Sequence, residues 1–176
     1  MAGFIVDEIV IRPATTADAD AVGAMWRKLV DYHQALDRDL PEAATDGAHR
    51  YAELLKQRID DPFTRAFIAE DKGHQVGFVL GMIVDLVPDI FAQEPCGFLA
   101  DIYVDTPYRR RGVGRALVRA LLGWFKEQGA PYFDWHVASA NTEGLAFWRS
   151  LGGRELMMRM RADVEDTDDR TALPDR

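Results

Sequence analysis

The order of strand-like and helix-like segments predicts a single α/β domain built around a mixed β-sheet. Two β-rich runs, residues 66–69 and 75–84, flank a short polar turn, which indicates an antiparallel hairpin. A strand, a long amphipathic helix and another strand follow, so a mixed sheet is expected rather than a doubly wound parallel one. A chain of 176 residues is long enough for one such domain with its own core and too short for two.

The first predicted elements are a strand and two helices. The run Ile-Val-Ile at residues 9–11 is rich in β-branched side chains and is halted by a proline. Thr15 or Thr16 then caps a helix whose apolar side chains recur every three or four residues as far as Leu36, which predicts one buried face. After a proline break, residues 51–59 predict a second, shorter helix.

The later predicted elements begin with a strand over residues 98–104. Residues 111–128 predict the clearest helix of the chain, with a regular apolar stripe, and Gly129 suits the position just past its end. Residues 163–176 are acidic with little apolar content and predict a disordered tail, so the single domain is assigned to residues 5–162. The other predicted elements are a strand at residues 132–138, a short helix at residues 142–151 and a final strand at residues 155–160.

Composition and charge limit the classes of partner and the cellular location that are expected for this protein. The net charge is −8, from 29 acidic and 21 basic residues, which argues against nucleic acid as the main partner. The longest apolar stretch, residues 76–84, is far shorter than the ~20 residues of a membrane span, so no membrane partner is expected. Cys96 is the single cysteine and the first residues lack a signal-peptide pattern, so the expected location is cytoplasmic. The histidines are scattered without metal-ligand spacing, so no metal is expected.

The most informative segment, residues 109–115, follows a strand and opens the long helix with the sequence Arg-Arg-Arg-Gly-Val-Gly-Arg. The first amides of a helix have no internal acceptor, glycine lets the backbone approach an anion, and arginine suits phosphate oxygens. The pattern therefore predicts a pyrophosphate site, although a solvated basic turn could have the same sequence. A P-loop fits less well because no Gly-Lys-Ser/Thr occurs. The dinucleotide fingerprint also fits less well, because Leu117 stands where its third glycine or alanine would be.

The segment Arg109-x-x-Gly112-x-Gly114 resembles the Gln/Arg-x-x-Gly-x-Gly/Ala signature of the GNAT superfamily of N-acetyltransferases. This resemblance implies a central, mostly antiparallel mixed sheet flanked by helices, with a splay between the strands at residues 98–104 and 132–138. Counterparts of the family's flanking motifs occur in the same order: Asp101-Ile102-Tyr103-Val104 and Pro107-Tyr108 before the signature, then Asn141, Ala146-Phe147-Trp148 and Leu151-Gly152-Gly153 after it.

The resemblance also implies acetyl-CoA as the co-substrate and indicates how it would be bound. Main-chain groups of the central strand would hold the pantetheine arm, the amides of the basic turn would hold the pyrophosphate, and Asn141 and Phe147 would contact the cofactor elsewhere. Asn141 could also cap the short helix that follows, and the two roles are compatible. The implied cofactor-binding residues are Ile102, Tyr103, Val104, Arg109, Arg110, Arg111, Gly112, Val113, Gly114, Arg115, Asn141 and Phe147.

Three residues are the catalytic candidates: Asp101, Val104 and Asn141. By resemblance, the Val104 amide would polarise the thioester carbonyl. Only about one alkyl amine in two thousand is neutral at pH 7, so a base is expected to help. Asp101 is the candidate base, although a carboxylate there could equally be solvated or ion-paired, and His136 is a second candidate that could be structural. Trp148 stands where many family members have a tyrosine that protonates the departing thiolate, and an indole cannot replace that acid.

The family usually builds its acceptor pocket from the first two helices, which points to Tyr32, His33 and Asp37 as substrate-binding residues. His33 lies on the apolar stripe of its helix, so a buried structural histidine is the alternative. The predicted function is transfer of acetyl from acetyl-CoA to a primary amine, on a small molecule or a peptide, by direct attack in a ternary complex. The family favours a homodimer. Two alternatives are a catalytically weak acyl-CoA-binding module of the same fold and an interaction protein whose basic turn contacts a partner.

Overall fold

The computed structural model describes residues 4–6, 8–84 and 95–162 of the chain. The tail expected at residues 163–176 lies outside these ranges. The chain divides into two compact units, Met1–Asn141 and Thr142–Arg176, and each is described by itself. Within the described ranges, no helix is long and apolar enough to cross a membrane.

The first unit contains a sheet that, among the described residues, has six strands, each beside the next one in sequence. Pairing is antiparallel from the first strand to the fifth, and the fifth and sixth strands are parallel. The prediction of a mixed, mostly antiparallel sheet is confirmed. The strands are β1 (Phe4–Val6), β2 (Ile9–Pro13), β3 (Thr64–Asp71), β4 (His74–Val84), β5 (Cys96–Val104) and β6 (Phe133–Trp135).

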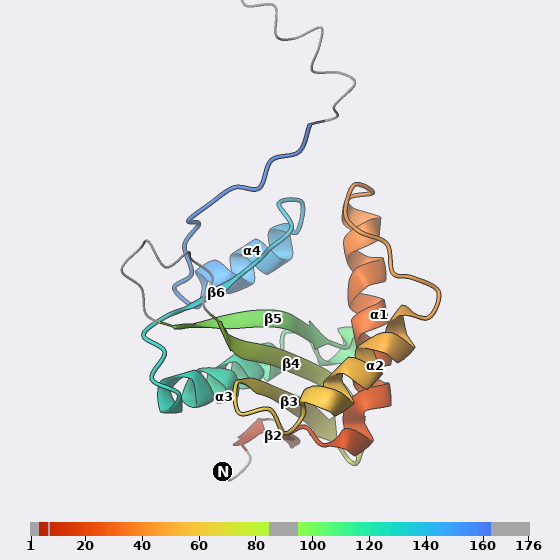
Figure 1. Ribbon diagram of the computed structural model, residues 1–176, viewed down its shortest axis with the longest axis vertical. Helices are drawn as coiled ribbons and strands as arrows, with labels where there is room; N and C mark the ends of the chain where they lie inside the picture. The colour runs from red at the N-terminus through yellow and green to blue at the C-terminus, as the bar shows by residue number, and fades with distance from the viewer. Residues whose placement is uncertain (1–3, 7, 85–94, 163–176) are drawn as a thin grey trace, which may run out of the picture. The chain divides into compact units, whose positions relative to one another are not determined.

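Helices cover both faces of this sheet (Figure 1). The helices of the first unit are α1 (Ala19–Leu36), α2 (Gly47–Arg58) and α3 (Val113–Glu127). Phe78 and Leu80 of β4 belong to the core that packs against α1 and α2. A Cβ added to Gly81, the next residue of the strand, would lie 2.8 Å from Leu121 of α3. Because successive side chains of a strand point to opposite faces, α3 lies on the face opposite α1 and α2.

The apolar stripe predicted for the long helix forms the buried face of α3. Gly129 has a φ of 78° just past the helix and ends it, as predicted. The helix packs closely on β5, since a Cβ added to Gly97 would lie 2.8 Å from the ring of Phe125, so only glycine fits there. The buried side chains recur three or four residues apart: Val113, Leu117, Leu121 and Trp124.

The first unit differs from the sequence expectations at several element bounds, including the following three. The first described elements form the β1–β2 hairpin, where only a strand at residues 9–11 was expected, because a three-residue strand carries too little pattern to be recognised. The second helix begins at Gly47 rather than at residue 51. The sixth strand spans only Phe133–Trp135 instead of residues 132–138, because its partner β5 diverges from it beyond Leu99.

The second unit contains α4 (Thr142–Arg149), which ends in a turn at Gly152 with a φ of 89°. The final strand expected over residues 155–160 is wrong, because residues 153–162 adopt neither helix nor strand. Met157 and Met158 in this segment are 95% and 81% exposed. Residues that favour strands form one only where a neighbouring strand pairs with their N–H and C=O groups by hydrogen bonds. Composition alone does not specify that neighbour.

A charged network ties β2 and β3 to the start of α1. Arg12 donates hydrogen bonds to both carboxylate oxygens of Asp18, at 2.7 and 2.8 Å, and to Glu70 at 2.6 Å. Asp18 is only 2% exposed and also accepts from the amide and the hydroxyl of Thr15, each at 2.8 Å. Hydrogen bonding from Arg12 holds the pKa of Asp18 well below its usual range, against the opposing effect of burial.

Replacing Asp18 by Asn should lower the free energy of unfolding by about 2–3 kcal/mol at pH 7, because Arg12 loses its main acceptor. Since the folded pKa of Asp18 is depressed, this stabilisation is present above about pH 4 and is lost as the pH falls below that value. Urea unfolding at several pH values measures the effect. Asp20→Asn is the control, because that side chain is 81% exposed and should change stability by about 0.5 kcal/mol or less. Equal losses in the two variants would contradict the assignment.

Candidate active site

The turn between β5 and α3 has the backbone of an anion-binding nest. A short 3₁₀ turn, Thr106–Tyr108, follows β5, and then Arg110 has a φ of 62° and Gly112 a φ of 83°. Glycine adopts such angles freely, whereas for arginine the left-handed conformation costs about 1–2 kcal/mol. Residues in this conformation turn successive N–H groups toward a common point, which is how backbone nests bind anions.

Several amides of this turn are unused within the protein. At the start of α3 the Ala116 amide donates to the Gly112 carbonyl at 3.0 Å. In the part of the chain that the structure describes, the amides of Arg110, Gly112, Val113 and Gly114 donate to no protein acceptor. The positive end of the α3 dipole lies at the same place. Convergent N–H donors with partial positive charge favour an anion with several oxygens.

The arginine side chains of the turn have different roles. Arg109 turns back toward the sheet, where its Nε donates to the carbonyl oxygen of Val104 at 2.9 Å. Its guanidinium also lies 5.5 Å from the ring centre of Tyr32 and 5.7 Å from that of Tyr103. Arg109 therefore fixes the turn to the end of β5 and to α1, and its side chain is engaged before any ligand binds. The guanidinium of Arg111 lies 5.4 Å from the ring centre of a neighbouring tyrosine, Tyr108.

Strand β5 splays from β6, as the family resemblance implies. The two strands pair only from Gly97 to Leu99, while β5 continues beside β4 to Val104. In the β4–β5 ladder Leu80 faces Asp101 and Gly81 faces Leu99, so Ala100 is an extra residue and forms a β-bulge. A bulge increases the local twist of its strand, which accounts for the divergence of β5 from β6.

The bulge also decides which amides face the gap between the splayed strands. Before it, the Gly97 amide donates to Tyr132 on the β6 side, at 3.0 Å. Beyond the bulge, the Asp105 amide donates to Val76 on the β4 side, at 2.9 Å. Because successive amides of a strand alternate in direction, the N–H groups of Val104 and Ile102 point away from β4. The predicted placement of main-chain donors at the splay thus follows from the register.

Asp101 lies beside Tyr51 and near His33, so that β5, α2 and α1 each contribute one of these residues. The Tyr51 hydroxyl donates to the Asp101 carboxylate at 2.7 Å, and the Tyr51 ring stacks on Trp26 with centroids 5.0 Å apart. Burial raises the pKa of Asp101, while the Tyr51 hydrogen bond and the nearby His33 oppose that rise. Burial lowers the pKa of His33. Asp101 is partly buried, and no ion pair joins it to another residue in the described ranges.

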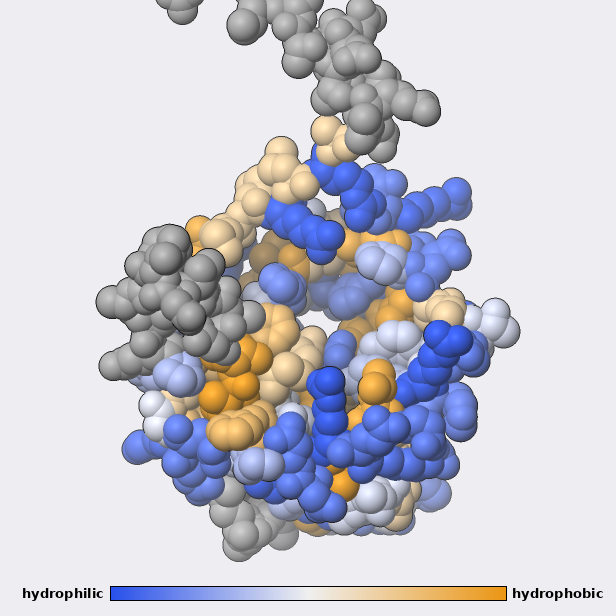
Figure 2. Space-filling model, in the orientation of Figure 1, coloured by the Kyte–Doolittle hydropathy of each residue, from blue (hydrophilic) through white to orange (hydrophobic). Residues whose placement is uncertain are grey.

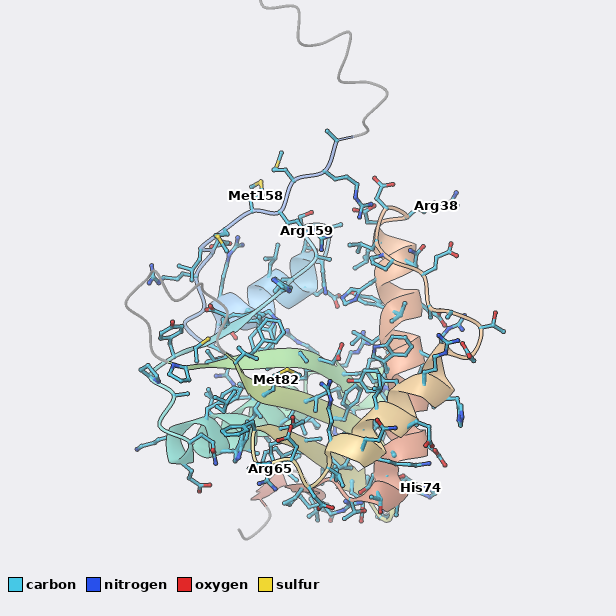
Figure 3. The ribbon with its side chains drawn as sticks, in the orientation of Figure 1. Arg38, Arg65, His74, Met82, Met158 and Arg159 are labelled. Carbon is cyan, nitrogen blue, oxygen red and sulfur yellow. The ribbon has the colours of Figure 1, made fainter. Side chains whose placement is uncertain are left out.

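A pocket of about 180 Å³ opens beside Asp101, on the face of the sheet that carries α2. Asp101 and Tyr51 are among its polar lining residues. Met82, labelled in Figure 3, lies near the end of β4, and Figure 2 shows apolar side chains gathered in the same region of this view. The other lining residues are Leu54, Leu55, Arg58, Thr64, Leu80, Met82 and Ala100.

Two of the three predicted acceptor residues, Tyr32 and His33, lie near other predicted site residues. The Tyr32 hydroxyl lies 3.4 Å from the Asn141 side-chain oxygen, and the rings of Tyr32 and His33 are 5.8 Å apart. Tyr32 therefore reaches from α1 to the predicted cofactor residue Asn141. Asp37 instead ends α1, where its carboxylate accepts the Asp39 amide at 2.9 Å. Phe147 belongs to the second unit, where its ring lies edge-on to Trp148 at 5.0 Å.

Sequence reasoning missed residues that position the site. Tyr51 looked like one apolar position of α2, and nothing in the pattern pairs it with Asp101. Lys28 of α1 forms an ion pair with Asp105 at 2.8 Å, which ties α1 to the end of β5 across 77 positions of sequence. His136, the second candidate base, makes an edge-on contact with Phe98 at 5.4 Å. Over the described residues, no three His, Cys, Asp or Glu side chains gather in a way that could hold a metal.

The sequence model of the Acetyltransferase (GNAT) family matches residues 29–152, which is more than half of the chain. The chain belongs to the GNAT acetyltransferase family. An uncharacterized N-acetyltransferase of Methanocaldococcus jannaschii is 30% identical over 108 residues, which are 61% of this GNAT chain and 46% of that protein. The chain thus spans about half the length of the curated relatives that it matches.

Solved structures share the fold of this GNAT chain. A mutant of the BH1408 protein of Bacillus halodurans has a TM-score of 0.76 at 20% identity, over 88% of this chain and 98% of that one. The aminoglycoside N-acetyltransferase AAC(6')-Iy in complex with CoA has a TM-score of 0.63 at 21% identity, over 92% of this chain and 98% of that one. At these identities the likeness shows the fold.

Replacing Tyr51 by Phe should raise the pKa of Asp101 further, because the variant loses the 2.7 Å hydrogen bond that favours the carboxylate. The ring that stacks on Trp26 is kept, so the fold should persist. Titration of the Asp101 carboxyl carbon by NMR measures the change. Tyr108→Phe is the matched control, because it removes a 2.9 Å hydrogen bond to Asp71 and leaves Asp101 untouched. An unchanged Asp101 titration in Tyr51→Phe would contradict the coupling.

Proposed function

We propose that this GNAT chain transfers the acetyl group of acetyl-CoA to a primary amine by direct attack in a ternary complex. The observation that carries the proposal is the group of unused amides around Gly112, which follows the end of β5, where that strand is paired with β4 alone. A diphosphate requires several N–H donors in a small space, and these amides supply them. Family membership and the CoA bound to a neighbour of the same fold support this cofactor.

In the proposed reaction the thioester lies beside Val104. The Val104 N–H, which faces the splay, would donate to the thioester carbonyl oxygen and stabilise the negative charge that develops there. The amine nitrogen attacks the carbonyl carbon and forms the C–N bond, and the C–S bond then breaks to release the CoA thiolate. The nitrogen loses one proton and the sulfur gains one, so the products are an acetylated amine and CoA.

Asp101 is the proposed base for the amine proton. Its side chain lies on the α1 and α2 face of β5, three residues before Val104. Because burial raises its pKa, Asp101 binds a proton more strongly than an exposed aspartate and accepts one from the attacking amine directly or through one water. His33 is largely neutral at pH 7, since burial lowers its pKa, and it is the second group able to relay that proton.

The tryptophan at position 148 favours a second candidate function, which is acyl-CoA binding without efficient acetyl transfer. In the family resemblance, a tyrosine at this position protonates the departing thiolate, and an indole N–H is no acid at these pH values. Transfer remains feasible because a thiol with a pKa of ~8.5 is a fair leaving group without assistance. Release of free thiol from acetyl-CoA across a mixed amine panel separates the two functions.

The cofactor proposal predicts that CoA protects the wild-type protein against heat. A ligand at one hundred times its dissociation constant adds about 2.7 kcal/mol to the free energy of unfolding. Arg110→Glu and Gly112→Trp should lose this protection, because one places a negative charge and the other a bulky ring at the nest. Arg119→Glu is the matched control, since that exposed residue lies further along α3. Protection retained in both nest variants would contradict the site.

The base proposal predicts that Asp101→Asn slows acetyl transfer by about a hundredfold or more while CoA affinity is kept. In the wild type, kcat/KM should fall as the pH decreases through the raised pKa of Asp101, because protonation removes the base. Initial rates of thiol release over a pH series measure both effects. Asp20→Asn, at an exposed site of α1, is the charge-matched control. A rate in Asp101→Asn close to that of the wild type would exclude Asp101.

A further inference from the structure

The pocket beside Asp101 is apolar in a way that restricts which amines can occupy it. Five of its nine lining residues are aliphatic: Leu54, Leu55, Leu80, Met82 and Ala100. Leu54 remains 52% exposed at the rim although it is a large apolar side chain. A pocket with such a lining stabilises an apolar group by removing it from water.

The two hydroxyl groups of the pocket already donate to carboxylates of the protein. The Tyr51 hydroxyl donates to Asp101 at 2.7 Å, and the Thr64 hydroxyl donates to Asp61 at 2.9 Å. A ligand rich in hydroxyl or amino groups would therefore find few partners inside, and burying unpaired polar groups is costly. Asp101 is the one anion in the lining and Arg58, at the exposed rim, is the one cation. The arrangement suits a single amine near Asp101 and disfavours a second cation near Arg58.

The size of the pocket limits the apolar group. Its volume is about 180 Å³, and a protein cavity of about 150 Å³ holds one benzene molecule. Val104 lies three residues beyond the pocket residue Asp101 along β5, so the Cα atoms of the two residues are about 10 Å apart. The amine nitrogen and the apolar group must therefore be joined by a short chain, so that one lies near the thioester while the other fills the pocket.

We propose that this pocket binds the apolar side group of a monoamine acceptor, of arylalkylamine or branched alkylamine type, with its nitrogen beside Asp101. The proposal rests on the acetyl-transfer function proposed above and adds the class of acceptor. The proposal excludes two classes of molecule as preferred acceptors: those with many hydroxyl and amino groups, such as aminoglycosides, and polyamines.

The test compares phenethylamine, ethanolamine, spermidine and kanamycin as acceptors with acetyl-CoA. We expect kcat/KM for phenethylamine to exceed that for ethanolamine by about tenfold or more, because a hydrophobic pocket typically discriminates to this extent between ligands with and without an apolar group that fills it. Spermidine and kanamycin should fall below phenethylamine as well. A preference for ethanolamine, spermidine or kanamycin over phenethylamine would overturn the proposal.

Variants locate the preference in the pocket. Met82→Trp fills it from a half-buried position of β4, and Leu54→Lys adds a second cation at its exposed rim, so both should lower the phenethylamine-to-ethanolamine ratio about tenfold. Leu122→Trp is the matched control, because Leu122 is 39% exposed on α3, on the opposite face of the sheet, and should keep the wild-type ratio. A wild-type ratio in both pocket variants would overturn the proposal.

Calorimetric titration of phenethylamine into the protein with CoA distinguishes this proposal from the function on which it rests. If no amine is acetylated but phenethylamine binds, and Met82→Trp and Leu54→Lys lose that binding, the pocket assignment stands and the transfer function fails. If thiol is released with other amines while phenethylamine neither binds nor reacts, the transfer function stands and the pocket assignment fails.

Discussion

The extra residue at Ala100 is the constraint on which the candidate site depends. Without this bulge, the alternation of β5 would continue and the amides of Ile102 and Val104 would bond to β4. With the bulge, those amides face the gap where β6 has diverged from β5, and Asp101 faces the layer of α1 and α2. One inserted residue thus places a main-chain donor and a carboxylate on two sides of one strand.

Several contacts then hold the end of β5 in position. Arg109 satisfies the Val104 carbonyl, so the amide of that residue is the group left for a ligand. Lys28 joins α1 to Asp105 immediately after the strand, and the Tyr103 hydroxyl donates to the same carboxylate at 3.2 Å. On the other face, Gly97 and Phe125 fix the start of β5 against α3. The strand is therefore anchored at both ends, with the bulge between the anchors.

The sequence predicted what depends on local pattern and missed what depends on distant partners. The periodicity of α3, the glycine at its end and the glycine-rich turn before it are local, and each matches the structure. The Tyr51–Asp101 hydrogen bond joins positions 50 apart, and no spacing rule connects them. The final strand failed for the related reason that residues 155–160 favour extended structure but require a partner that composition does not name. Asp37, which the family resemblance assigns to the acceptor pocket, accepts the Asp39 amide in the turn after α1, a local contact that the resemblance does not include.

The left-handed conformation of Arg110 has a kinetic consequence. The free-energy cost of this conformation for a non-glycine residue is offset by the fold around it, so we expect the turn to have this shape before an anion arrives. An arriving anion then has no loop to order, and the entropy loss on association is correspondingly small. Capture at such a rigid corner is governed by diffusion and long-range charge, so its rate should depend more on ionic strength than on chain motion.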